Sequence, residues 1–183
     1  MSFASVDRLT TAAEKNPLRV KEAKEQGRKI VGLYCLYSPA EIALAAGASP
    51  MVLCGTRNDP IATAEETLPR NLCPLIKSSY GFAVQGTCPY FSASDLIVAD
   101  TTCDGKKKMF EFMAEQKPLH LLYLPHGPHL PEARAFWAAE MRRLVERLEK
   151  EFGVAIDDAA LNKAIALSNR ERAALKAFMD LAK

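Results

Sequence analysis

The sequence predicts an α/β fold in which helices cover the faces of an open parallel sheet. Short apolar segments rich in β-forming residues alternate with longer helical patterns, and this alternation is typical of parallel sheets. Each apolar segment is bounded by Gly, Pro, Asp or Ser, which commonly end strands. We predict strands at 29–35, 50–55, 95–100 and 118–125. The α/β core then extends over residues 28–126.

Residues 1–27 precede the sheet and are expected to form a separate helical segment. Residues 4–26 are charged and weakly amphipathic, with Pro17 inside the pattern and Gly27 directly after it. Proline disrupts the interior of a helix, and glycine is the residue that most often follows a helix end. We therefore predict a helix that is broken near Pro17 and closed by Gly27.

The segment after the first strand carries the signals of a helix start. Ser38 precedes Pro39, and Glu41 stands three residues after Ser38. Proline is favoured at the first helical position, and Ser-x-x-Glu is the pattern of a capping box. Ser38 and Glu41 are therefore predicted to cap this helix.

The remaining helices are predicted from apolar residues at helical spacing. Two follow the second and third strands, at 71–83 and 104–116, and two longer ones follow the fourth strand, at 129–153 and 157–183. Each of the longer helices has an apolar stripe. The stripes consist of Phe136, Met141, Leu144 and Leu148 in the first, and of Leu161, Ile165, Leu175 and Phe178 in the second. Because the last pattern is still periodic at residue 183, we expect residues 127–183 to lead into a further domain.

Charge and hydropathy argue against two classes of partner. The chain has 24 Lys and Arg against 22 Asp and Glu, a net charge of +2, which implies no polyanionic partner such as nucleic acid. No segment approaches the roughly 18 apolar residues of a membrane-spanning helix, and the N-terminus lacks the layout of a signal peptide. We expect a cytoplasmic protein that binds neither nucleic acid nor membranes.

All five cysteines fall at predicted strand ends or helix starts. They are Cys35 and Cys54 at the ends of the first two strands, Cys103 after the third, and Cys73 and Cys88 directly before a proline. Strand carboxyl ends and helix amino ends meet at one edge of a parallel sheet, where such folds bind ligands. Helix N-termini also lower the pKa of thiols and so favour the thiolate that binds metal. We therefore expect all five thiols at one edge.

The spacing of the cysteines favours an iron–sulfur site. In a reducing compartment structural disulfides are rare, which leaves free thiols or metal ligands. Zinc sites are usually built from close pairs such as Cys-x2-Cys, which this sequence lacks. Iron–sulfur clusters accept cysteines from several separate loops. The alternative is that the thiols only fill packing positions, above all Cys35 and Cys54 in their apolar runs.

Three lysines in a row open the predicted helix at 104–116. The helix dipole disfavours cations in the first turn, so Lys106, Lys107 and Lys108 need an explanation. The ordinary interpretation is a solvated face. The functional one is compensation of an anionic cluster, or a docking patch for an electron donor.

Four long motifs together resemble one known family. They are YCLYSPAEIALAAGASPMVLCG, AEETLPRNLCPLIKSSYGFA, CPYFSASDLIVADTTCDGKKKMFE and FWAAEMRRLVERLEKEFG. In this order they resemble the 2-hydroxyacyl-CoA dehydratase D-component and benzoyl-CoA reductase family, in particular its branch of double-cubane cluster proteins. The resemblance runs from about residue 28 to the end. It implies flavodoxin-like α/β domains, and therefore a flavodoxin/Rossmann-like open sheet with a helical C-terminal segment.

The resemblance also implies a cofactor and an electron donor. Family members hold a [4Fe–4S] cluster or a double-cubane [8Fe–7S] cluster through cysteines and receive single electrons from an ATP-hydrolysing iron–sulfur activator. Cys73 and Cys103 match positions that ligate the cluster throughout the family. Cys35 and Cys88 favour the double-cubane branch, which needs more thiolates, and Cys54 is a weaker candidate. Family chains continue into further domains that supply at least one more cysteine.

Two classes of function follow from these observations. In the first, the chain is the cluster-bearing part of an oligomeric enzyme that dehydrates an acyl-CoA through a radical or reduces a small molecule. In the second, it is a non-enzymatic α/β binding module or a thiol redox sensor whose cysteines pack. No glycine-rich phosphate loop is present, so ATP hydrolysis is assigned to a partner.

Overall fold

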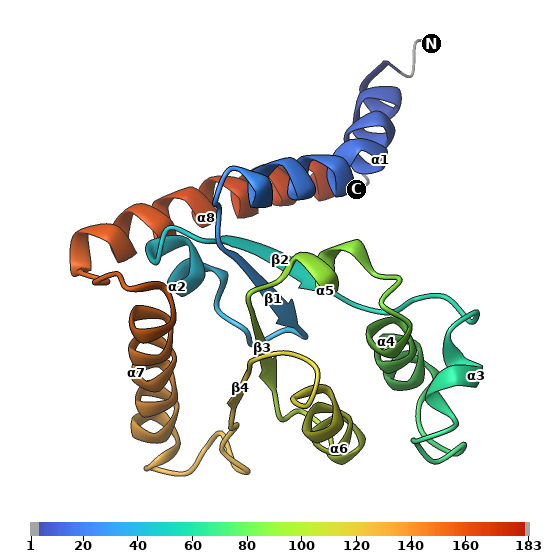
Figure 1. Cartoon of the computed structure of the whole chain (residues 1–183). Coiled ribbons are helices and arrows are strands. Elements are labelled where there is room, and N and C mark those ends of the chain that lie inside the picture. The colour runs from blue at the N-terminus through green and yellow to red at the C-terminus, as the bar shows by residue number, and fades with distance from the viewer. Residues whose placement is uncertain (1–3, 182–183) are drawn as a thin grey trace.

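The computed structural model of the protein describes residues 4–181 and contains an open sheet of four parallel strands (Figure 1). The strand order across the sheet is β2–β1–β3–β4. The strands are β1 (Ile30–Tyr34), β2 (Ser49–Leu53), β3 (Leu96–Asp100) and β4 (Leu119–Leu122). Each strand overlaps its predicted range, so the predicted α/β class with an open parallel sheet is confirmed.

The two central strands, β1 and β3, are buried at every position. Helices cover both sides of such a strand, which explains why its sequence is a continuous apolar run without alternation. The chain adds β2 on one side of β1 and then β3 and β4 on the other, so the strand order reverses direction between β1 and β3. In open α/β sheets the carboxyl ends of the strands at such a point form the usual ligand crevice.

Helices cover both faces of the sheet (Figure 1). One face packs against α2 (Ala40–Ala45) and α7 (Ala133–Phe152), and the other against α4 (Pro74–Gln85), α5 (Pro89–Ala93) and α6 (Asp104–Met113). The short helix α3 lies against α4. Its bounds are Ile61–Ala64. The buried core includes Leu96, Val98, Leu144 and Leu148 on the first face and Ile97, Phe110 and Met113 on the second.

The N-terminal helix α1 (Ala4–Glu25) is continuous, so the predicted break near Pro17 is wrong. Most side chains of α1 are exposed, including Ala13 one turn before Pro17, whereas Pro17 itself is half-buried and Val20 is buried. Water can therefore reach the backbone carbonyl that loses its hydrogen bond to Pro17, which lowers the cost of a proline in a helix interior. The predicted helix end is confirmed, because Gly27 has a φ of +83° and follows the last turn.

The predicted capping box at α2 is also wrong. Ser38 Oγ donates to the carbonyl oxygen of Tyr34 at 2.9 Å, and Pro39, whose side chain has no group to cap with, occupies the cap position. The Glu41 carboxylate pairs instead with Arg172 of α8, the helix at Asp158–Asp180. The end of β1 lies close enough for its carbonyl to take the Ser38 hydroxyl, so tertiary structure overrides the local pattern.

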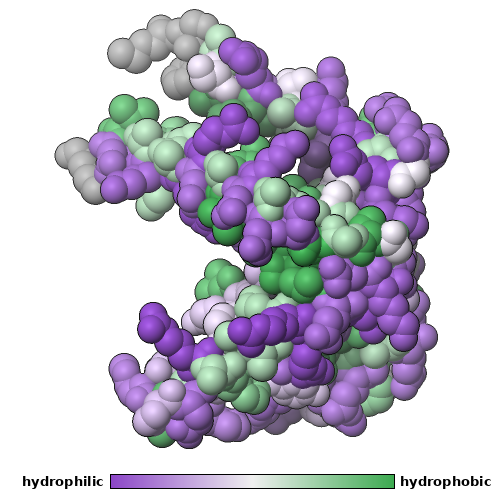
Figure 2. Space-filling view, turned by 90° about the vertical axis from the view of Figure 1, so that its left-hand side faces the viewer, coloured by the Kyte–Doolittle hydropathy of each residue, from purple (hydrophilic) through white to green (hydrophobic). Residues whose placement is uncertain are grey.

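The last helix, α8, packs on α2, and its buried residues, Ala164 and Ser168, lie in its first half. From Asn169 to Asp180 every residue is exposed, including Leu175 and Phe178 of the predicted stripe. Figure 2 shows apolar atoms on the projecting ends of α1 and α8, beside the terminal residues drawn in grey. No helix in the described part of the chain is long and apolar enough to span a membrane.

Candidate thiol site at the carboxyl edge of the sheet

Cys35 and Cys54 leave two neighbouring strands side by side. Tyr34 of β1 lies opposite Leu53 of β2 in the parallel register, and each cysteine is the next residue along its strand. Both cysteines, together with Lys106, line a mostly apolar cavity of about 360 Å³ between the strand ends and helices α4 and α6. The carboxyl edge of the sheet therefore contains a thiol-lined cavity at its usual ligand position.

Cys35 has an unusual backbone conformation. Its φ is +69°, and among residues 4–181 no other residue apart from glycine has a positive φ. The left-handed region costs a residue with a side chain roughly 1–3 kcal/mol, and such strain is concentrated at functional sites. The fold therefore keeps a cysteine at a position where the backbone of a glycine would be less strained.

Cys73 and Cys103 begin helices α4 and α6, and their thiols are exposed. Neither side chain accepts a capping hydrogen bond from its own helix. The two helix starts lie together, because a Cβ atom built on Gly105 would stand 3.1 Å from Leu72 Cδ2 and 3.0 Å from Ile76 Cδ1. We call Cys35, Cys54, Cys73 and Cys103 the thiol edge.

Cys88 differs from the four thiols of the thiol edge because its helix precedes a strand. Burial, and then the nearby Cys88, Cys54 and Cys35, raise the pKa of Tyr34, so Cys88 lies within electrostatic reach of the same side chain as Cys54 and Cys35. The expectation of five thiols at one edge stays a prediction. Cys88 begins α5, which leads into the amino end of β3, and its sulfur accepts a hydrogen bond from Phe91 N–H at 3.4 Å. Its side chain is half-buried against the core that contains Phe91 and Tyr80. A cysteine before a proline starts a helix in both cases, but α5 lies before a strand and α4 follows one.

A close backbone contact fixes the position of Cys54. The next residue, Gly55, donates its N–H to Ser79 Oγ at 3.0 Å. A Cβ atom on Gly55 would come within 2.4 Å of Ser79 N and 2.5 Å of the carbonyl carbon of Ser78. Only glycine allows the chain after β2 to approach α4 this closely.

Lys106 brings a positive charge to the thiol edge. It lines the same cavity as Cys35, close enough to interact with that thiol, and its Nζ donates a hydrogen bond to Thr102 Oγ1 at 2.7 Å. Burial works against the charged ammonium group, but the contact with Cys35 and the nearby Asp100 together raise the pKa of Lys106. Burial raises the pKa of the Cys35 thiol, and the contact with Lys106 offsets only part of this effect.

Asp100, which sequence reasoning did not single out, joins the loops of the thiol edge. This fully buried carboxylate ends β3 and accepts hydrogen bonds from Tyr37 N–H at 3.1 Å and from Thr102 Oγ1 at 2.7 Å. Tyr37 follows Cys35, and Thr102 precedes Cys103. The sequence does contain one signal for Asp100, because this charged residue directly follows the apolar run LIVA of the strand.

The thiols have the chemistry of iron–sulfur ligands but do not form a closed set within this chain. All five cysteines are free of disulfides. Within residues 4–181, no three His, Cys, Asp or Glu side chains lie close enough together to hold a metal ion. Thiols delivered singly from several loops suit a cluster better than they suit zinc. The thiol edge therefore fits part of a cluster site.

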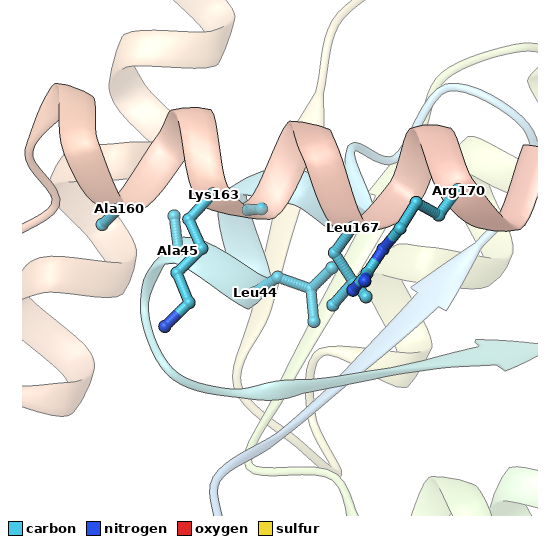
Figure 3. Close-up of a pocket in the computed structure, with 7 residues that line it drawn as sticks. Leu44, Ala45, Ala160, Lys163, Leu167 and Arg170 are labelled. Carbon is cyan, nitrogen blue, oxygen red and sulfur yellow. The ribbon is translucent and has the colours of Figure 1, made fainter.

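Two other features lie away from the thiol edge. His120 of β4 is buried and its Nε2 atom has no hydrogen-bond partner; burial, with Arg143 and Arg147 nearby, lowers its pKa to about 4. A second cavity of about 310 Å³ lies between α2 and α8, with Lys163 and Arg170 beside an apolar floor (Figure 3). It contains no cysteine.

Known proteins resemble this chain over most of its length. Residues 35–183 match the family model described as 2-hydroxyglutaryl-CoA dehydratase, D-component. The Escherichia coli (strain K12) protein YjiM, whose name describes it provisionally as a dehydratase subunit, is 52% identical over 178 residues, which are 97% of this chain and 46% of that protein. The beta subunit of lactoyl-CoA dehydratase from Anaerotignum propionicum is 29% identical over 158 residues, 86% of this chain and 41% of that protein.

A third relative is the (R)-phenyllactyl-CoA dehydratase beta subunit of Clostridium sporogenes, 27% identical over 173 residues, 92% of this chain and 45% of that protein. The chain spans less than half the length of these curated relatives. The matched range 35–183 contains all four cysteines of the thiol edge and Cys88. Because the family model covers most of its residues, the chain belongs to the 2-hydroxyglutaryl-CoA dehydratase D-component family.

Proposed function

We propose that this chain forms the iron–sulfur-cluster-binding portion of a 2-hydroxyacyl-CoA dehydratase-like enzyme. The observation that carries the proposal is the thiol edge, where four free cysteines follow strands or begin helices at the ligand position of a parallel sheet and two of them line one cavity. Membership of the dehydratase family supports the same reaction class. A reductase of the double-cubane type would use the same edge, with more of the thiols as ligands.

Cys73 and Cys103 are the first candidates to hold the cluster, and Cys35 is the third. Cys73 and Cys103 stand at the N-termini of α4 and α6, and both side chains are exposed. Neither thiol is engaged as a helix cap, so both are available to a ligand. A bound cluster would supply one-electron chemistry to an acyl thioester. Because the described residues offer no closed set, we propose that further ligands come from outside residues 4–181.

The names of the relatives suggest the substrate and partners. Those relatives act on lactoyl-CoA and (R)-phenyllactyl-CoA, and both are beta subunits. We therefore propose an acyl-CoA substrate and a hetero-oligomer. Low-potential electrons would come from a separate ATP-dependent iron–sulfur activator.

Iron and sulfide analysis tests this proposal. The chain is purified without oxygen and reconstituted with iron and sulfide, beside its Cys73→Ala, Cys103→Ala and Cys88→Ala variants. We expect iron in the parent and the Cys88→Ala variant, and its loss in the other two. A parent chain that stays free of iron, also when it is part of a full-length protein, would contradict the proposal.

One observation favours a second candidate, a thiol redox module. Cys35 and Cys54 directly follow residues paired in the register of neighbouring strands, and both line one cavity. This function predicts a colourless protein with titratable thiols and a Cys35–Cys54 disulfide after treatment with a small-molecule disulfide. The iron content of the same purified protein distinguishes the cluster-binding function from the thiol redox function.

A further inference from the structure

Only one of the three lysines that open α6 faces the thiol edge. Lys107 Nζ lies 3.0 Å from Asp104 Oδ1, and Lys108 forms an ion pair with Glu111. Lys106 forms no salt bridge with a carboxylate in the described part of the chain and lines the cavity beside the Cys35 thiol. The solvated-face interpretation therefore suits Lys107 and Lys108, and Lys106 needs another one.

The position of Lys106 is built by buried groups. Its ammonium donates to Thr102 Oγ1 at 2.7 Å, and that hydroxyl donates to the Asp100 carboxylate at 2.7 Å. Asp100 is fully buried and also holds the backbone N–H of Tyr37, two residues after Cys35. One chain of hydrogen bonds thus connects the ammonium group to the two loops that carry Cys35 and Cys103.

The local energetics of α6 do not explain this lysine. A cation in the first turn of a helix is disfavoured by a few tenths of a kcal/mol, and a long side chain loses rotamer freedom when it is fixed. The buried Asp100 carboxylate, reached through Thr102, compensates part of these costs, and a further negative group near the ammonium would compensate the rest. The cavity beside Lys106, lined also by Cys35 and Cys54, is where such a group would lie.

We propose that Lys106 is a positioning residue that attracts an anionic group to the thiol edge, beside Cys35. The group is a thiolate or the sulfide of a bound cluster; the second form rests on the proposed function. Asp100 and Thr102 hold the lysine in place. Lys107 and Lys108 take no part.

The first test uses the full chain without any cluster. The rate of Cys35 modification is measured by mass spectrometry with a dianionic reagent, dithiobis-nitrobenzoate, and with a neutral one, dithiodipyridine. Both reagents react with the thiolate, so the ratio of the two rates cancels the thiolate fraction and reports the local charge. Lys106→Met should lower this ratio by about threefold or more, because attraction of the anion is lost.

Two variants make this result specific to the charge of Lys106. Lys106→Arg should keep the ratio near that of the parent, since it keeps the cation. Lys107→Met is the matched control and should leave the ratio unchanged. An unchanged ratio in Lys106→Met, or the same fall in Lys107→Met, would overturn the inference.

The second test uses reconstituted protein and separates this inference from the proposed function. We expect Lys106→Met to retain less iron per chain than Lys107→Met, or to bind a cluster with a more negative reduction potential. If the parent binds no iron, the proposed function fails, and the rate ratio alone decides the role of Lys106. Suppose instead that the parent binds iron. If Lys106→Met then leaves the rate ratio, the iron content and the reduction potential unchanged, the inference fails and the proposed function remains.

Discussion

The two ends of the sheet use their polar side chains in different ways. At the amino end the groups bind one another: the Asp95 carboxylate accepts hydrogen bonds from Ile30 N–H at 2.8 Å and from Lys24. Lys117 Nζ donates to two backbone carbonyl oxygens of the segment before β3. These contacts join α1, α5 and the strand starts.

At the carboxyl end the reactive groups are left available. Cys54, Cys73 and Cys103 are exposed, and the last two start helices without capping them. Cys35 is held in the left-handed conformation, and a buried carboxylate supports the loops. The difference indicates that the amino end serves stability, whereas the carboxyl end accepts strain in order to present thiols.

The largest effect is expected from Gly55→Ala at the carboxyl end. The added Cβ atom would overlap the backbone of Ser78 and Ser79, so we expect a loss of about 3 kcal/mol in the free energy of unfolding, measured with urea. Gly105→Ala is the control, because its Cβ atom meets only the flexible ends of Leu72 and Ile76. Equal stability of both variants would show that the thiol edge does not depend on this close contact.

Asp95→Asn tests the amino end and should cost about 2 kcal/mol at pH 7, since a charged acceptor for Ile30 and Lys24 is lost. Although burial opposes the charge, the hydrogen bond from Lys24 and other contacts lower the pKa of Asp95 in the folded chain. Its contribution is thus complete above about pH 4, the ordinary value for Asp, and is lost as the pH falls further.

Urea unfolding at pH 7 and pH 3 measures this contribution. The gap between the parent and Asp95→Asn should shrink at the lower pH. Asp59→Asn removes an exposed carboxylate that pairs with Arg57 on the surface and should cost less than about 0.5 kcal/mol at either pH. A gap of the same size at both pH values would contradict the role given to the Asp95 charge.

The sheet could be predicted from the sequence because its signal is local and repeated. Each strand is an apolar run between turn residues, and each alternates with a helical pattern, so small errors in the bounds leave the order unchanged. The positions of Cys73 and Cys103 followed from this order, since each begins a helix after a strand. Their role as ligands stays a prediction.

The details that failed depend on tertiary contacts. Cys88 has the same Cys-Pro signal as Cys73, but its helix leads into a strand and its sulfur caps that helix, which the signal did not distinguish. Ser38 bonds a strand carbonyl, and Glu41 pairs with a helix distant in sequence. Asp100 was missed because its hydrogen-bond partners come from two loops that only the fold brings together.

A smaller effect is expected from a pair of substitutions at Cys35. Both Cys35→Gly and Cys35→Ala remove the thiol, but only glycine relieves the left-handed backbone, so the glycine variant should be about 1 kcal/mol more stable than the alanine variant. The same pair at Cys103, where φ is −151°, should show no advantage for glycine. Urea unfolding measures both pairs. Equal stability of the two Cys35 variants would show that its conformation stores no strain.

The smallest effect is expected from removing the exposed thiols. Cys73→Ala and Cys103→Ala should each change the free energy of unfolding by less than about 0.5 kcal/mol, because neither thiol caps its helix. Cys88→Ala should cost about 1 kcal/mol, because its cap and core contacts are lost. A large loss for Cys73→Ala or Cys103→Ala would place these thiols among the stabilising groups and remove the contrast between the two ends. If the free energy of unfolding changes little and iron binding is lost in the same two variants, the cysteines at these helix starts serve a ligand rather than the fold.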